Sequence, residues 1–186
     1  MATPRTGQGS SGPEVDIQQA GLRLSPTIVT GVLLGIGIAG FIDESLFHQL
    51  LQWHNFYWAT DARGRILSDG LFHVGSTLVL LWGTWRLWRD RARWTPGHAR
   101  ALLGGILAGA GGFNTYDGVV QHVILHLHLV NEHVCAVPMD PHNSILSCRA
   151  DIPFEVVWIV IGAAVLAAGV VVARQALAHR STATPR

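Results

Sequence analysis

Histidines and carboxylates recur in this sequence in one repeated order. The pattern Asp-x4-His-x5-His occurs twice, 74 positions apart: at Asp43, His48 and His54, and at Asp117, His122 and His128. Imidazole suits zinc, copper and iron, and carboxylates add hard oxygen ligands. Bundles of helices also hold paired metals with a comparable ligand set. The repeat therefore predicts a transition-metal site, with copper, zinc or iron as the ion, to which both copies contribute.

Helical spacing adds further candidates, because side chains four residues apart share one face of an α-helix. Four such pairs stand near one end of the apolar segments: Glu44 and His48, Asp69 and His73, His122 and His126, and Asp151 and Glu155. The ligands we expect first are His48, His73, His122, His126, Asp43, Asp69 and Asp117. Secondary candidates are Glu44, His54, His128, His133, Asp151 and Glu155. The aspartates act either as ligands or as acceptors that hold an imidazole tautomer.

Helix geometry limits how these residues combine. Asp43 and His48 are five residues apart, so on a regular α-helix they point about 140° away from each other. Either one of them orients a neighbour of the site, or a local π-bulge brings the two together. His126 and His128 also face nearly opposite ways, which predicts that one of them points away from the shared site.

Three readings of the polar cluster remain open at this stage. The first is a bound metal, with haem disfavoured because carboxylates do not usually ligate haem iron. The second is a buried network of hydrogen bonds and ion pairs that only fixes helix register. The third is a proton or ion pathway, which intramembrane ionisable groups also support. The sequence has no nucleotide-binding loop, no Ser/His/Asp signature and no context for a nucleophilic cysteine, and whether the chain catalyses a reaction stays open.

The elements that position these residues are expected to be membrane helices. The chain has 186 residues, of which 49% are hydrophobic and 13% charged. Lipid offers no partner to backbone groups, so spanning segments of about 20 apolar residues must be helical. We predict an all-α, multi-pass membrane protein folded as a four-helix bundle, with the lipid bilayer around it and no nucleic acid partner. The four apolar spans lie at about 27–47, 70–88, 101–125 and 153–173.

Arginine sets the expected orientation. All 13 basic residues are arginines, and most stand before the first span, between the second and third, or after the fourth. The positive-inside rule then places both termini in the cytoplasm and most histidines outside. We expect a disordered tail at 1–24, a membrane domain at 25–176 and a short tail at 177–186, in a bacterial inner membrane. The first span would serve as an uncleaved signal anchor.

Glycines repeat at the same offset as the histidines. Gly31 and Gly35 recur as Gly105 and Gly109, and such small-xxx-small faces permit close helix contact. This predicts that spans one and three touch. It also predicts two tandem helical hairpins related by an axis along the membrane normal. In the second helices the similarity is thinner and rests on Asp69-x3-His73 and Asp151-x3-Glu155.

The two cysteines, Cys135 and Cys148, both fall in the loop that this topology places outside. Thiols commonly oxidise in that compartment, so we expect a disulfide between them. A cysteine-based metal site is less favoured, because 12 residues separate the pair and no Cys-x2-Cys spacing is present.

Several segments resemble a family of uncharacterised bacterial four-helix membrane proteins. They are the stretch from Gly40 to His54, the motif Asp69-Gly70-Leu71-Phe72-His73, the stretch from Tyr116 to His122, and Asn131-Glu132-His133. The resemblance covers nearly all of the chain after residue 25 and implies an integral membrane fold without an assigned activity. It also associates the chain with respiratory-oxidase or copper-assembly functions, so the protein partners we consider are a respiratory complex or a second copy of the chain.

The resemblance lowers the rank of one candidate ligand. Glu44 stands where the family commonly has glycine, as this chain itself has at Gly118. This departure puts Glu44 in doubt as a general ligand, and we rank the seven first candidates above it.

Overall fold

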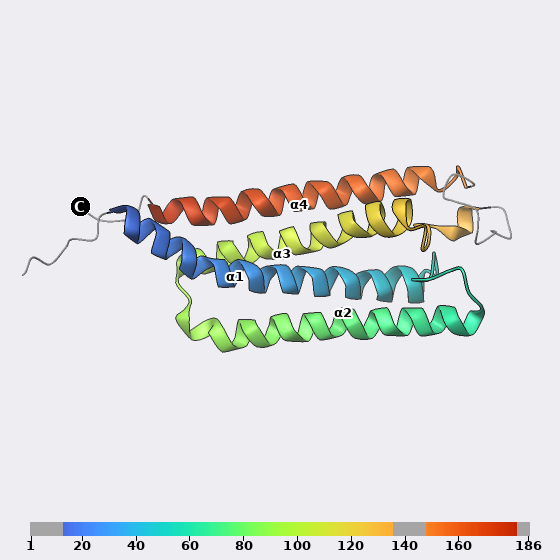
Figure 1. Ribbon diagram of the computed structural model, residues 1–186, viewed down its shortest axis with the longest axis horizontal. Helices are drawn as coiled ribbons and strands as arrows, with labels where there is room; N and C mark the ends of the chain where they lie inside the picture. Colours follow the sequence, from blue (N-terminus) through green and yellow to red (C-terminus); the bar gives the residue numbers. More distant parts are fainter. Residues whose placement is uncertain (1–12, 136–147, 182–186) are drawn as a thin grey trace, which may run out of the picture.

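The computed structural model is an assembly of long helices that run side by side (Figure 1). It describes residues 13–135 and 148–181, which contain four α-helices and no strand. The helices are α1 (Pro13–Ile42), α2 (Ala62–Asp90), α3 (Pro96–Tyr116) and α4 (Ile152–Ser181). Two π-helical segments, η1 (Asp43–Leu50) and η3 (Asp117–Ile124), continue α1 and α3, and the short 3-10 turns are η2 (Arg91–Arg93) and η4 (Glu132–Val134).

The helices lie in a row rather than in a square. Helix α2 packs on α1, α1 on α3, and α3 on α4, so α1 and α3 form the middle of the molecule (Figure 1). The prediction of an all-helical fold is therefore confirmed. The beginning of α1 and the end of α4 lie at one end of the molecule's long axis, and the π-helical segments with the histidines lie at the other.

Close contact between α1 and α3 depends on the repeated glycines. A Cβ atom built on Gly35 would collide with the carbonyl oxygen of Ile106, and one on Gly109 with that of Val32. Because the backbones approach this closely, any side chain at these two positions would force the helices apart. The predicted contact between the first and third spans is confirmed.

Three helical stretches of the described residues are long and apolar enough to cross a membrane: Pro26–Leu50, Ala62–Arg93 and Ile152–Ala178. Four had been predicted, and α3 is the one that does not qualify. Six glycines, together with Asn114 and Thr115 near its end, dilute its apolar residues. Its neighbours on both sides, α1 and α4, cover a large part of its surface.

The ends of the helices differ from the predicted boundaries. Helix α1 begins at Pro13, so residues 13–24 are helical where a disordered tail was expected. The parts of the two predicted tails at 1–12 and 182–186 lie outside the described residues. A disulfide joins Cys135, just after η4, to Cys148, shortly before α4.

Candidate metal centre

Two π-helical turns place each aspartate beside the histidine five residues later. In η1 and η3 the backbone hydrogen bonds join residues five apart, so side chains at that spacing share a face. His48 Nε2 lies 3.6 Å from Asp43 Oδ2, and His122 Nε2 lies 3.1 Å from Asp117 Oδ2. Of the two arrangements that helix geometry allowed for these pairs, the structure has the π-helical one.

The chain reverses direction just after each π-helix. Gln52 and His126, again 74 positions apart, have φ angles of 53° and 51°. This left-handed conformation is uncommon for residues other than glycine. Two residues later in each copy comes the last histidine of the motif, so the reversal directs His54 and His128 back toward the helix ends.

The two copies of the motif form two adjoining triads of buried side chains. In each triad, one potential ligand atom per residue lies within 4.8 Å of the others: Asp43, His48 and His54 form one triad, and Asp117, His122 and His128 form the other. The exposed fraction is 3% or less for all six residues. The rings of His54 and His128, one from each triad, stack on each other with centroids 4.7 Å apart. We call these six residues the central cluster.

Hydrogen bonds between the two copies fix the imidazoles of His54 and His128. His54 Nδ1 donates to the carbonyl of Val130 at 2.7 Å, and His128 Nδ1 donates to the carbonyl of Phe56 at 2.9 Å. Each acceptor lies two residues beyond the corresponding histidine of the other copy. Burial lowers the pKa of His54 well below its ordinary value, so its imidazole is neutral at pH 7 and its Nε2 carries a lone pair.

Carboxylates on the outer helices fix the other two imidazoles. His48 Nδ1 lies 3.1 Å from Asp69 Oδ1, and His122 Nδ1 lies 2.9 Å from Glu155 Oε2. A carboxylate only accepts, so the Nδ1 proton of each ring points to it. Every histidine of the central cluster therefore uses Nδ1 to hold its orientation, an arrangement typical of metal-ligating histidines.

The Nε2 atoms of the four histidines face the inside of the cluster, where they lie near one another and near Asp43 and Asp117. His122 Nε2 lies 2.8 Å from His128 Nε2. With both Nδ1 atoms protonated, two neutral rings would direct lone pairs at each other, so a proton or a cation must lie between them. His48 Nε2, His54 Nε2 and Asp43 Oδ1 are buried and have no hydrogen-bond partner among the described residues.

The carboxylates of α2 and α4 have matching partners. Besides their histidines, Asp69 Oδ1 accepts from the backbone N–H of Phe56 at 2.7 Å, and Glu155 Oε1 accepts from that of Val130 at 3.2 Å. Phe56 and Val130 are 74 positions apart, whereas Asp69 and Glu155 are 86 apart. By these contacts Asp69 resembles Glu155, whereas the sequence comparison of the second helices paired Asp69-x3-His73 with Asp151-x3-Glu155.

The two halves of the site differ at one position. Glu44 is fully buried, and its Oε2 lies 3.1 Å from His48 Nδ1, so His48 faces an additional carboxylate. The corresponding residue is Gly118, where an added Cβ would collide with the Ile159 side chain. Glu44, His48 and Asp69 form a third group whose ligand atoms lie within 4.8 Å of one another.

Other sequence candidates lie outside these groups of the described residues. His73 is half-buried against the Phe41 ring, at 5.4 Å between centroids. His126 is exposed and donates from Nδ1 to the His122 carbonyl at 3.1 Å, and His133 is exposed as well. Asp151 is buried and accepts from the N–H of Asn131 at 2.8 Å. Burial raises the pKa of Asp151 to about 6.

The structure thus brings together a different set of the candidate residues. His54 and His128, which α-helical spacing placed second, lie in the two triads, whereas His73 and His126 lie outside them. The signal for them was present in the repeated motif itself, which contains both. The role of the Phe56 and Val130 carbonyls could not be predicted from the sequence, because every residue type has a backbone carbonyl.

Residues 30–176 match a family model described as "Predicted membrane protein (DUF2243)". The match includes the whole central cluster and its carboxylate partners. The chain belongs to this family. No curated protein and no solved structure gives a significant match. Membership in DUF2243 confirms the resemblance to an uncharacterised membrane family, and it leaves the chemistry of the site to be argued from the geometry.

Proposed function

We propose that the protein binds a transition metal in the central cluster. The observation that carries this proposal is the orientation of the four imidazoles: a carbonyl or carboxylate holds each Nδ1, and each Nε2 is left for the cluster. A single proton could satisfy the close His122 and His128 nitrogens. It could not also satisfy the unpartnered nitrogens of His48 and His54, which lie in the other triad.

The donor set favours a non-haem ion. Four imidazole nitrogens and two carboxylates suit zinc, copper or iron. Direct ring contacts support this choice, since His122 and His128 have centroids 4.4 Å apart and leave no space for a porphyrin between them. When bound, such an ion supplies Lewis acidity or, for copper and iron, electron transfer. Metal handling or redox chemistry is the function that we assign to the site.

We further propose a topology in which two tandem hairpins cross a bacterial inner membrane with both termini in the cytoplasm. Equivalent contacts support the repeat. Trp58 N–H donates to the Leu127 carbonyl at 3.2 Å, and Glu132 N–H donates to the Trp53 carbonyl at 2.8 Å, each partner 74 positions from its counterpart. The arginine distribution supports the orientation. Helix α3, flanked by α1 and α4, would then be the fourth span.

A scaffold without metal is the second candidate function. Ion pairs in the site join separate helices, since His48 to Asp69 connects η1 with α2, and His122 to Glu155 connects η3 with α4. A fully protonated network of this kind would fix the helices and could present them to a respiratory-complex partner or to a second copy. It predicts that the same variants lose stability while no metal is bound.

Elemental analysis of the tag-free protein in detergent tests the proposal. We expect at least one copper, zinc or iron ion per chain. His54→Ala, His122→Ala and His128→Ala should each reduce the metal content. Each should weaken metal affinity by more than the roughly 10- to 100-fold that loss of an orienting partner costs. The matched control is His73→Ala, which removes a histidine near the same end of the molecule and should leave metal content unchanged.

Folding is checked in each variant by circular dichroism and by elution volume. Metal content that is unchanged in folded His122→Ala and His128→Ala variants would overturn the proposed centre. Absence of metal after reconstitution with each of the three ions, together with lower thermal stability of the variants, would favour the scaffold.

A further inference from the structure

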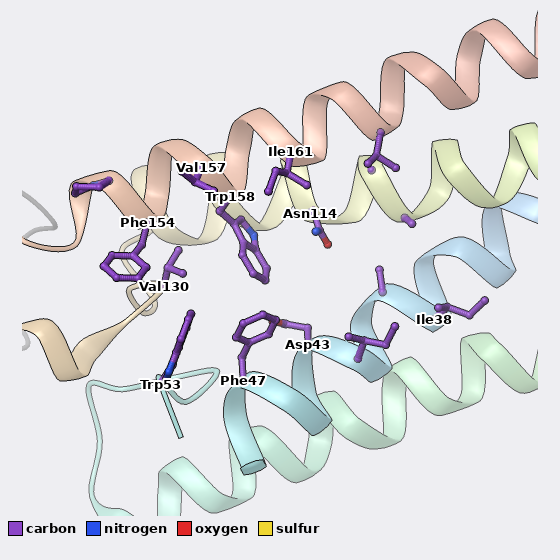
Figure 2. A pocket seen from close by; sticks show the side chains of 16 residues that line it. Ile38, Asp43, Phe47, Trp53, Asn114, Val130, Phe154, Val157, Trp158 and Ile161 are labelled. Carbon is purple, nitrogen blue, oxygen red and sulfur yellow. The ribbon is translucent and has the colours of Figure 1, made fainter. Parts of the chain in front are cut away.

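A second candidate site lies beside the central cluster, in the cleft between α1 and α4. It is a cavity of about 700 Å³ lined by α1, α3 and α4, and it extends past Phe47 of η1 to Trp53 and Phe154 (Figure 2). Most of its lining is aliphatic or aromatic, as Ile38, Phe47, Trp53 and Phe154 illustrate. This volume lies within the range of pockets that hold small organic ligands.

The mouth of the cavity lies on a lipid-facing surface. Ile42, Val157 and Ile161 line it and are 50%, 56% and 53% exposed. They belong to two of the stretches that are long and apolar enough to cross a membrane. A molecule dissolved in the bilayer could therefore enter sideways, without passing through water.

Two buried polar atoms among the lining residues have no hydrogen-bond partner among the described residues. One is Asp43 Oδ1, an acceptor, and the other is Trp158 Nε1, whose N–H is a donor. Figure 2 shows the side chains of Asp43, Trp158 and Asn114 around this cavity. Buried polar groups are normally paired, so an unpaired acceptor and an unpaired donor on one apolar cavity indicate a ligand that supplies both partners.

The chemistry of these two atoms selects the head group of the ligand. A hydroxyl donates one hydrogen bond and accepts others, so it offers a partner to an acceptor such as Asp43 Oδ1 and to a donor such as Trp158 Nε1. An ether, ester or ketone only accepts and would leave the carboxylate unpaired.

A comparable cavity on the other side of the molecule lacks this polar pair. It measures about 550 Å³ and is lined by α2 residues, among them Leu71, Phe72, Ser68 and Ser76. Both serine hydroxyls already donate to backbone carbonyls, Ser68 to Arg65 and Ser76 to His73. This cavity has a similar size and an apolar lining, but none of its lining residues has an unpaired buried side-chain nitrogen or oxygen. It therefore serves as an internal control.

We infer that the cavity between α1 and α4 binds a membrane-dissolved molecule with a hydroxyl head and a long apolar tail. The head pairs with Asp43 or Trp158, and the tail extends along Val157 and Ile161 toward lipid. This site is additional to the proposed metal centre, and it also brings the hydroxyl beside one residue of the central cluster. Aliphatic alcohols and phenols or hydroquinones share this chemistry, and the experiment below distinguishes them.

The test uses a photoreactive long-chain alcohol that carries a diazirine in its tail, with its methyl ether as the matched probe. The full-length protein in detergent is labelled, and the labelled peptides are identified by mass spectrometry. We expect the alcohol to label α4 around residues 153–165, and the ether to label it about tenfold less, because the ether cannot donate to Asp43. Val157→Trp, which fills the cavity, should abolish the labelling, whereas Leu71→Trp should preserve it.

Competition then identifies the source of the hydroxyl. Protection by unlabelled dodecanol supports an aliphatic alcohol, protection by decyl hydroquinone supports a phenolic ligand, and protection by neither overturns the inference. Equal labelling by alcohol and ether, or undiminished labelling of Val157→Trp, also overturns it. Metal content is measured on the same samples, so a protein that binds the alcohol without metal, or metal without the alcohol, separates the two proposals.

Discussion

Each imidazole of the central cluster presents one defined nitrogen because its other nitrogen is occupied. His54 and His128 are held by carbonyls, which accept only from a protonated Nδ1. His48 and His122 are held by carboxylates, which also make the opposite Nε2 a stronger donor to a metal. The site thus contains two kinds of orienting partner, of which only the carboxylates can be removed by substitution.

Glu155 offers the clearest test of this orienting role. Replacing it with alanine removes the acceptor for His122 Nδ1 and for the Val130 N–H while leaving all six residues of the central cluster in place. We expect Glu155→Ala to weaken metal affinity about 10- to 100-fold, measured by competition with a chelator of known affinity. Glu155→Gln retains an acceptor oxygen and should fall between alanine and wild type. Equal affinity of all three proteins would contradict the assignment.

At the residue scale, the sequence contained the signal for the central cluster, but α-helical spacing did not indicate which of the candidate residues come together. The repeated motif contained all six residues of the central cluster. Ranking by α-helical spacing then favoured His73 and His126, because four residues separate them from Asp69 and His122. The actual spacing is that of a π-helix, which no local composition marks, and only the five-residue distance between Asp43 and His48 indicated it.

At the scale of elements, the site depends on two reversals of the chain in a left-handed conformation. Gln52 and His126 adopt this conformation although neither is glycine. Side chains with a Cβ atom are less stable there by about 1–2 kcal/mol. This loss of stability occurs twice, at Gln52 and at His126. It is consistent with a chain reversal that is needed to direct His54 and His128 into the cluster.

His126→Gly separates the role of the turn from any role of the imidazole. Glycine adopts positive φ without strain, so we expect thermal unfolding to show the variant more stable, by up to about 1 kcal/mol. The His126 ring lies outside the groups that could hold an ion, so metal content should be unchanged. A fall in metal content to the level of His122→Ala would instead make His126 a ligand.

The pairing of α1 with α3 makes a second prediction at this scale. Gly35→Ala places a Cβ against the Ile106 carbonyl oxygen, and the backbone has little freedom to yield. We expect a loss of stability of about 1–3 kcal/mol, as for other overpacked contacts. The matched control is Gly70→Ala in α2, where an added Cβ meets no atom within 4 Å and should be neutral or slightly stabilising. Equal loss in the two variants would contradict close packing of α1 on α3.

At the scale of the whole molecule, hydropathy predicted the all-helical membrane fold but not the nature of each helix. Helix α3 is central, and glycines take the place of the aliphatic residues that mark a lipid-facing span. The similar contacts of α2 and α4 were hard to predict because Asp69 and Glu155 are 86 positions apart and not 74. The likeness is visible only in the contacts that each carboxylate makes with a histidine and a backbone N–H.

One ion pair connects the first turn of α2 with η4 and gives the molecule a pH-dependent contact. Arg65 Nη1 lies 3.7 Å from Glu132 Oε2, while Glu132 Oε1 is buried without a hydrogen bond among the described residues. Burial raises the pKa of Glu132 from 4.5 to about 7, even though Arg65 acts in the opposite direction. In the unfolded chain the carboxyl ionises first, so the folded state binds more protons between these two values.

Stability contributed by Glu132 must therefore fall as pH rises from about 4.5 to about 7, and stay level above that. Glu132→Gln cannot ionise and keeps the shape of the side chain. We expect its unfolding temperature to match wild type near pH 4.5 and to exceed it at pH 8, with the difference growing across the interval. A wild-type protein that gains stability relative to the variant as pH rises would mean that the folded-state pKa of Glu132 is lowered, with Arg65 outweighing burial. The sign of this difference thus decides whether the contact between the two halves is governed by desolvation or by the ion pair.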